Sequence, residues 1–210
     1  MSAPKTISDL AGYETVQTAS LDVLEAEAVE HTIASADSGE GIKGLAYCIG
    51  SIDLKPFKST KDDEYLLTYE LNVLGAVRAL RAAEKGLKKA NGSVVLFSTI
   101  AVSQGFANHS LISTAKGAVE GLTKALAAEW APKVRVNCIA PSLSDTPLAK
   151  PLTSSEQMAN SIAAMHPIPR LGTPDDSAAL AKFLLTEESG WISGQVMHVD
   201  GGRSTLRTKG

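Results

Sequence analysis

The chain has 210 residues, of which 44% are hydrophobic and 20% charged, and its formal net charge is −3 at pH 7. These proportions are typical of a globular protein, so we expect one domain over residues 1–210. Lysine and arginine are scattered among acidic residues without a basic stripe, which argues against nucleic acid as a partner. No apolar run reaches the ~18 residues of a membrane-spanning helix, so no membrane partner is expected.

The cysteine and histidine positions predict no metal site. Cys48 and Cys138 lie in apolar, strand-like segments and are expected to be buried thiols in a reducing compartment. The four histidines are far apart and lack the spacing of metal ligands. The N-terminus also lacks the charged-then-apolar order of a signal peptide. We therefore expect a cytoplasmic protein without a bound metal.

The first part of the chain alternates predicted strands with a helix. β-Branched residues in short alternation over residues 13–19 predict a strand. Asp22 is expected to cap a helix that begins near Leu24 and ends at Ala36. The apolar run over residues 44–50 then predicts a short buried strand.

Helical spacing of apolar residues marks the longer helices. It predicts a helix over residues 64–85, with Leu67 and Leu71 on its apolar face, and a second helix over residues 108–130. Capping signals near Ser154 and at Thr173 predict two further helices.

Apolar, β-branched runs between these helices predict the remaining strands. Alternating strands and helices are typical of an α/β fold, in which helices cover both faces of a parallel sheet. We predict that four strands are neighbours in this sheet. They are residues 44–50, 93–98, 134–139 and 196–199.

Six motifs occur in an order that resembles the short-chain dehydrogenase/reductase family, abbreviated SDR. They are "CIGS", "LNVLG", "FSTIA", "ISTAK", "APSLSDTP" and the C-terminal pair "RLGTPDD" and "WISGQVMHVDGG". The resemblance extends from about residue 13 to residue 206. It implies a Rossmann-like fold and an oxidoreductase that uses NAD or NADP on a small carbonyl or alcohol substrate.

The resemblance also implies the roles of three polar residues. Lys116 matches the family lysine, which hydrogen-bonds the nicotinamide ribose and lowers the pKa of a catalytic tyrosine. Asn72 matches an asparagine that holds a water molecule in the proton relay, although an asparagine inside a helix is also expected to have a structural role. Thr99, or alternatively Ser98, stands near the position of the catalytic serine.

The cofactor-binding positions implied by the same resemblance are Gly50, Lys116, Pro141 and Thr146. Gly50 is the glycine that remains of an Asn-Asn-Ala-Gly strand end, and Thr146 matches a threonine that contacts the cofactor. Asp22 matches a position near the adenine, but the simpler interpretation is a helix cap. The sequence does not choose between NAD and NADP.

Two departures from the family pattern concern catalysis. Ile112 stands four residues before Lys116, where the family has the tyrosine that delivers the proton, and isoleucine cannot donate one. His109 lies one helical turn before Ile112, where a surface histidine is the favoured interpretation and a replacement acid is the other. The second departure is that no G-x-G-x-x-G or G-x-x-x-G-x-G pattern occurs, although such turns bring backbone N–H groups to the pyrophosphate.

We therefore expect an SDR-like domain without the first glycine-rich βαβ unit, in which dinucleotide binding and catalysis are impaired or lost. The alternative is a non-catalytic ligand-binding or oligomerisation protein derived from an SDR. The family implies assembly of the chain with itself, as a dimer or tetramer, through the helices over residues 64–85 and 108–130.

A different class of enzyme is also consistent with one spacing in the sequence. Ser113 and Lys116 form an S-x-x-K pattern, which places a hydroxyl and an amine on one helical face, as in serine hydrolases of the Ser-Lys type. The companion motifs S-D-N and K-T-G are missing, so this hypothesis ranks third.

Overall fold

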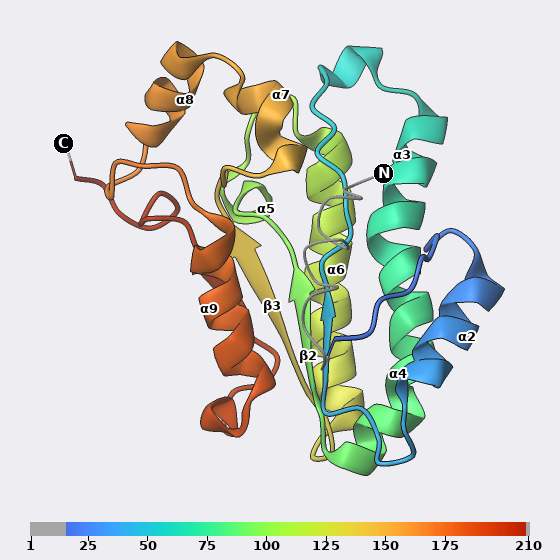
Figure 1. Ribbon diagram of the computed structural model, residues 1–210. Helices are drawn as coiled ribbons and strands as arrows, with labels where there is room; N and C mark the ends of the chain where they lie inside the picture. The colour runs from blue at the N-terminus through green and yellow to red at the C-terminus, as the bar shows by residue number, and fades with distance from the viewer. Residues whose placement is uncertain (1–15, 209–210) are drawn as a thin grey trace.

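Four parallel strands form the central sheet of the computed structural model, which describes residues 16–208 (Figure 1). Their bounds are β1 Gly44–Tyr47, β2 Ser93–Phe97, β3 Arg135–Pro141 and β4 Val196–Val199. They lie side by side in chain order, and Val94 in β2 pairs with Leu45 on one side and Val136 on the other. The predicted α/β fold and the order of the four predicted strands are confirmed.

Helices connect these strands and cover both faces of the sheet. The α-helices are α2 Ala26–Ala36, α3 Asp62–Tyr69, α4 Gly75–Ala90, α5 Ala101–Gln104, α6 Ser110–Trp130, α7 Lys150–Thr153, α8 Glu156–Ala163 and α9 Pro174–Leu185. A π-helical turn, η2 Glu70–Leu74, joins α3 to α4, and short 3-10 turns are η1 Phe57–Ser59, η3 Pro147–Ala149 and η4 Glu187–Ser189. Within residues 16–208, no helix combines the length and hydropathy needed to cross a bilayer.

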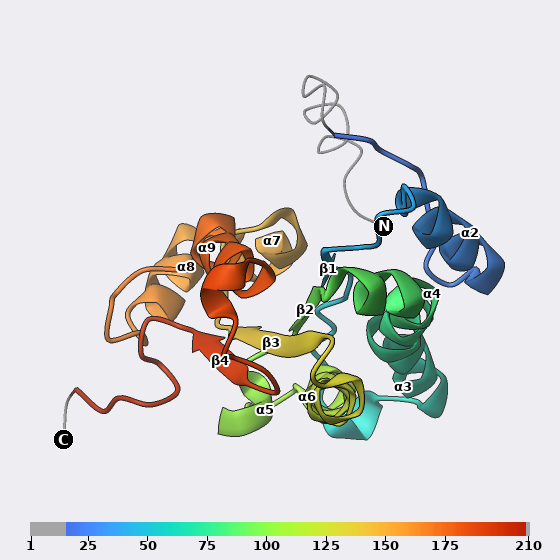
Figure 2. The ribbon, with the colours of Figure 1, turned by 90° about the horizontal axis from the view of Figure 1, so that it is seen from below.

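The sheet separates two hydrophobic cores. Because side chains alternate along a strand, Val94 and Leu96 of β2 face the core formed with α2, α4 and α6, whereas Val95 faces α9. The side chains of Val94, Val95 and Leu96 are all fully buried. Figure 2 shows α4 and α6 on one side of the strands and α9 on the other. Two-sided burial explains the continuous apolar run of this strand.

The start of α9 follows the predicted capping signal. The Thr173 hydroxyl accepts a hydrogen bond from the Asp176 backbone N–H at 3.4 Å, and the Asp176 carboxylate accepts one from the Thr173 N–H at 2.7 Å. Pro174 occupies the first helical position, where its missing N–H needs no partner. This reciprocal cap fixes where the helix begins at the edge of the sheet.

The strand predicted over residues 13–19 is not present in residues 16–19. Residues 13–15 lie outside the described residues, and residues 16–19 are exposed and form no strand. They therefore do not pair with β1, whose outer edge meets no other strand of the described chain. Cys48 follows β1 and is exposed, so the prediction of a buried thiol is wrong there and confirmed for Cys138.

The helix predicted over residues 64–85 is present as α3, the π turn η2 and α4 in direct succession. The π turn adds extra backbone within one turn, which rotates the side chains that follow it around the helix axis. Leu67 of α3 is 61% exposed, whereas Leu80 of α4 is 1% exposed. A single uniform period of 3.6 residues could not predict this rotation.

Helix α4 approaches β1 closely because it begins with a glycine. A Cβ on Gly75 would stand 2.2 Å from the hydroxyl oxygen of Tyr47, and that hydroxyl donates a hydrogen bond to the Leu71 carbonyl at 2.9 Å. Burial of the ring raises the pKa of Tyr47 to about 12. Only glycine therefore allows this helix to lie against the strand at its observed distance.

We expect Gly75→Ala to lower the free energy of unfolding by roughly 1–3 kcal/mol, because overpacking at the Tyr47 hydroxyl outweighs the helix propensity of alanine. Urea denaturation measures the change. The cost should be smaller in a Tyr47→Phe background, since the nearest ring carbon is then 3.3 Å away. Gly121→Ala in α6 is the matched control, because a Cβ there meets nothing within 4 Å. Equal effects at positions 75 and 121 would contradict this account.

Candidate functional site

The carboxyl ends of β1, β2 and β3 open into a cavity of about 1040 Å³. Because these strands run in one direction, the residues that follow them meet at one edge of the sheet. Six of the residues predicted for catalysis or cofactor binding line this cavity. They are Gly50, Thr99 and its alternative Ser98, Lys116, Pro141 and Thr146.

Asn72 lies behind Gly50, close to Lys116. A Cβ on Gly50 would stand 2.7 Å from Asn72 Oδ1 and 3.1 Å from Lys116 Nζ, so the two polar side chains converge on this glycine. Asn72 Nδ2 donates to the Thr68 carbonyl at 2.9 Å and to Ser51 Oγ at 3.3 Å, which fixes the orientation of the amide. Asn72 Oδ1 is buried without a hydrogen-bond partner among the described residues. The π turn that carries Asn72 is a feature often found at functional sites.

Lys116 reaches the cavity from the second turn of α6. The side chain is buried, with a relative exposure of 8%, and Nζ donates to the Phe97 carbonyl at 2.9 Å. Within residues 16–208, no carboxylate lies within ion-pair distance of this amine. Burial lowers the pKa of Lys116 to about 8, and the neighbouring thiols of Cys138 and Cys48 oppose this shift.

Ile112 stands one turn before Lys116 on the wall of the cavity. Its side chain is 5% exposed and packs where α6 enters the site. No tyrosine of the described chain lines the cavity. His109 does line it, and its Nδ1 lies 2.7 Å from the Ala107 carbonyl, so Nδ1 is the donor in this contact and Nε2 is the ring nitrogen left for a ligand.

The two hydroxyls at the end of β2 have different partners. Ser98 Oγ donates to a carboxylate oxygen of Glu120 at 2.6 Å and is 5% exposed. Thr99 Oγ1 accepts from the Ala101 N–H at 3.3 Å, and the threonine lines the cavity. Because Ser98 already donates its proton to a carboxylate, Thr99 is the hydroxyl that is available to a ligand.

Thr146 and Pro141 line the cavity at the end of β3 and just after it. Pro141 is the last residue of β3, and Thr146 caps the turn η3 by accepting from the Ala149 N–H at 3.2 Å. Beyond them, short helices provide an apolar cover. Its side chains are Leu148, Leu152, Met158, Ile162 and Met165, and they line the cavity.

The S-x-x-K pair does not form a catalytic dyad. Ser113 Oγ donates to the Ala101 carbonyl at 3.3 Å, whereas Lys116 Nζ donates to the Phe97 carbonyl at 2.9 Å. Ser113 is also absent from the wall of the cavity. The hydrolase hypothesis therefore has no geometric support.

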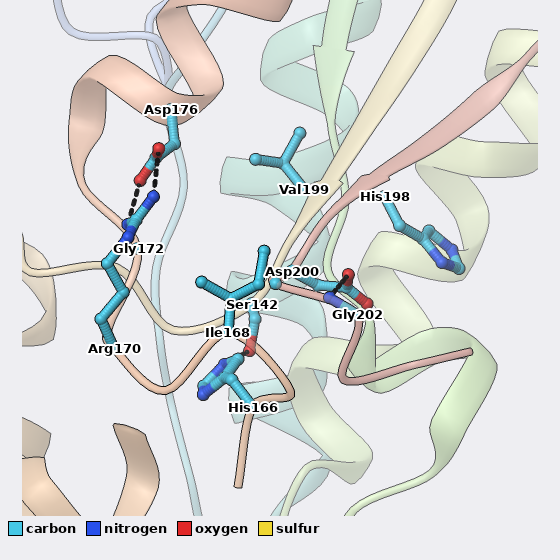
Figure 3. A pocket seen from close by; sticks show the side chains of 11 residues that line it. Ser142, His166, Ile168, Arg170, Gly172, Asp176, His198, Val199, Asp200 and Gly202 are labelled. Atoms are coloured by element: carbon cyan, nitrogen blue, oxygen red, sulfur yellow. Dashed lines mark hydrogen bonds and ion pairs between the residues drawn. The ribbon is translucent and has the colours of Figure 1, made fainter. Parts of the chain in front are cut away.

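A second pocket of about 360 Å³ lies beside the end of β4 (Figure 3). Within it, Ser142 Oγ lies 2.8 Å from His166 Nε2, and His166 Nδ1 lies 2.9 Å from the Ile162 carbonyl. The carbonyl can only accept, so the proton is on Nδ1 and the Ser142 hydroxyl donates to Nε2. This hydrogen bond ties the end of α8 to the end of β3. The pair was not predicted, because its members are 24 residues apart and match no motif.

Among the described residues, no group of three or more histidine, cysteine or acidic side chains is arranged to hold a metal ion. Thus the site consists of an amine, an amide and hydroxyls around an apolar cavity at the carboxyl ends of parallel strands. That arrangement is typical of α/β proteins that bind nucleotides and small substrates.

Comparisons with known proteins agree with this class. A family model described as Enoyl-(Acyl carrier protein) reductase matches residues 2–204. The chain belongs to the short-chain dehydrogenase/reductase family, as the order of its motifs predicted.

Among characterised relatives, Short-chain reductase protein NovJ of Streptomyces niveus is 33% identical over 190 residues, which are 87% of this chain and 72% of NovJ. Tropinone reductase-like 3 of Erythroxylum coca is 40% identical over 134 residues, which are 64% of this chain. The match spans 52% of the length of that coca protein.

Solved structures show the same fold. The structure titled "ElxO with NADP Bound" has a TM-score of 0.87 and 32% identity, and the match covers 96% of this chain and 84% of that one. The aldohexose dehydrogenase of Thermoplasma acidophilum also has a TM-score of 0.87, with 27% identity over 95% of this chain and 82% of that one.

The charge of Lys116 should make stability depend on pH. The pKa of this lysine is lowered from 10.5 to about 8, so the charged amine costs stability below pH 8. This cost, on the order of 3 kcal/mol at most, fades as the pH rises from about 8 towards 10.5. We expect Lys116→Met to be more stable than the wild type at pH 7, with a smaller difference at pH 9.

Thermal or urea denaturation of both proteins at the two pH values measures this difference. The buried thiol of Cys138, whose pKa is raised to about 12, is present in both proteins and largely cancels in the comparison. A difference that stays constant from pH 7 to pH 9 would show that Lys116 is not a desolvated, titrating amine.

Proposed function

We propose that this chain has an SDR-type oxidoreductase site. The site is impaired in transferring a proton to a small carbonyl compound or from a small alcohol. The observation that carries the proposal is Ile112, which faces the cavity one helical turn from Lys116. A placed general acid contributes roughly 10²–10⁴ to the rate, and an isoleucine contributes nothing of this kind.

The residues around Gly50 fit the ribose end of a nicotinamide cofactor. Lys116 Nζ lines the cavity and has N–H donors beyond the one given to Phe97, and these suit ribose hydroxyls. Thr146 and Pro141 line the same cavity, where they would contact the cofactor. Such a cofactor supplies hydride, and the chain's own residues would orient it and the carbonyl. The likeness to ElxO with NADP supports NAD or NADP as the class of cofactor.

Proton delivery is the step for which the side chains of the site are least suited. Thr99 can hydrogen-bond a carbonyl oxygen and polarise it, but its hydroxyl is far too weak an acid to replace a tuned phenol. His109 Nδ1 faces the Ala107 carbonyl, so Nε2 is the ring nitrogen left for a ligand. Hydride transfer in this site would therefore lack the positioned phenol, and His109 is the remaining side chain that could replace it.

A second candidate function follows from the apolar cover of the cavity. Leu148, Met158 and Met165 are 47–58% exposed and lie over a cavity that is large enough for a drug-sized molecule. A non-catalytic protein that binds an apolar ligand would use the same cavity without hydride transfer.

A cytoplasmic location, inferred from composition, stays a prediction.

Two measurements on the purified 210-residue chain distinguish these functions. We expect no oxidation of NADH or NADPH above that of the Lys116→Met variant when hexanal or cyclohexanone is supplied. Titration calorimetry with NAD and NADP is the companion measurement. Binding without turnover supports the impaired oxidoreductase, and absence of binding supports the non-catalytic ligand-binding protein. Robust turnover by the wild type would overturn the proposal.

We also propose that the chain assembles with itself through α3, α4 and α6. Leu66 and Leu67 of α3 are 71% and 61% exposed in the single chain, which is unusual for leucines on neighbouring positions of a helix. A symmetric partner that packs on this face would bury both side chains.

Light scattering should therefore give the mass of a dimer or tetramer at micromolar concentration. Leu67→Glu should shift the population towards the monomer, because a carboxylate would have to be desolvated in the interface. Leu206→Glu is the matched control, since Leu206 is 59% exposed and lies outside these helices. A wild-type monomer would contradict this proposal.

A further inference from the structure

Lys116 is a buried amine that no acidic group neutralises. Its Nζ has one hydrogen bond, to the Phe97 carbonyl, and no carboxylate of the described chain lies within ion-pair distance. Glu120, one turn further along α6, accepts a hydrogen bond from Ser98 instead. The tyrosine that such a lysine serves in related proteins is replaced by Ile112. Lys116 is thus a buried amine whose main role in a hydride-transfer site, lowering the pKa of a tyrosine, is lost.

A second observation points to a ligand at the same place. Asn72 is 1% exposed, and its Oδ1 has no hydrogen-bond partner in the described chain. This oxygen and Lys116 Nζ lie 2.7 Å and 3.1 Å from the point where a Cβ on Gly50 would stand. A buried acceptor without a donor is costly, so a donor that reached Asn72 Oδ1 beside Lys116 would be stabilised there.

The cavity in front of Lys116 is suited to an apolar carbonyl compound. Its volume is about 1040 Å³, and aliphatic and aromatic side chains make up most of its wall. These side chains include Ile49, Ile52, Phe97 and Ile112. Lys116 itself is 8% exposed, so little water reaches the amine, which favours both the neutral amine and the loss of water from an adduct.

We propose that Lys116 captures an apolar aldehyde or ketone covalently, as an imine on Nζ. The nitrogen lone pair of the neutral amine attacks the carbonyl carbon, a C–N bond forms as the π bond of the carbonyl breaks, and a proton moves from nitrogen to oxygen to give a carbinolamine. The C–O bond then breaks, and the oxygen leaves as water with that proton and with the second proton of the amine. The product is the C=N bond, and no oxidant or reductant is required.

The neighbouring groups have definite roles in this step. Burial lowers the pKa of Lys116 to about 8, so a substantial fraction of the amine is neutral near physiological pH. Asn72 does not line the cavity, but its Oδ1 shares the surroundings of Gly50 with Lys116 Nζ, where it would accept a hydrogen bond from the nitrogen of the carbinolamine or of a protonated imine. Ile112 adds an apolar wall in place of a phenol, which leaves the amine free to react. The proposal does not depend on NAD or NADP, so it stands apart from the proposed function.

Reductive trapping tests the proposal. The whole chain is incubated with hexanal and sodium cyanoborohydride, which converts an imine into a stable hexyl-lysine, and peptide mass spectrometry locates the adduct. We expect Lys116 to be labelled at least about tenfold more than any other lysine, because its neutral fraction is larger. Lys116→Met should lose this preferred adduct. Lys182→Met is the matched control and should keep it, since Lys182 also lines the cavity but is exposed.

Two further arms keep the test decisive if Lys116→Met folds poorly. The wild type in denaturing urea should lose the preference for Lys116, because the surroundings that lower its pKa are gone. Asn72→Leu should retain the adduct at a level several-fold below the wild type, because the hydrogen-bond acceptor is removed. Labelling of folded wild type that is spread over exposed lysines, with Lys116 no higher than the rest, would overturn the proposal.

Discussion

Burial of β2 on both faces is the constraint on which the rest of the molecule depends. Val94, Val95 and Leu96 are completely buried, and they contribute to separate cores on opposite sides of the sheet. The strand must therefore be covered by helices on both faces, and parallel neighbours with helical crossovers satisfy that requirement. The same topology brings the carboxyl ends of β1, β2 and β3 together, so the burial of one strand also determines where a ligand can bind.

Much of the fold could be predicted from local patterns. The apolar run of β2 and the start of α9 at Thr173 are determined by residues close in sequence, and both were predicted correctly. Predictions failed where a distant partner or an unusual turn is involved. Residues 16–19 have the composition of a strand, but none of the described strands pairs with them. Leu67 is exposed although the spacing of apolar residues assigned it to an apolar face, and the π turn η2 that follows α3 has no periodic signature.

The candidate site was predictable to the extent that the family resemblance places residues at strand ends. Gly50, Thr99, Lys116 and Pro141 all line one cavity, although their roles stay predictions. What the sequence could not predict is the state of each group. Three such properties depend on residues far apart in sequence. Within residues 16–208, Asn72 Oδ1 has no hydrogen-bond partner, no carboxylate forms an ion pair with Lys116, and Ser98 donates to Glu120. These properties turn a resemblance into specific chemical hypotheses.

The contact between Ser142 and His166 has a consequence for how the apolar cover is held over the cavity. The imidazole is 4% exposed, and each of its nitrogens has a partner on a different element. Nδ1 lies 2.9 Å from the Ile162 carbonyl in α8, and Nε2 lies 2.8 Å from Ser142 Oγ, which directly follows β3. One buried ring therefore bridges the helix and the sheet, so α8 can separate from the strand only if a hydrogen bond of this ring is broken.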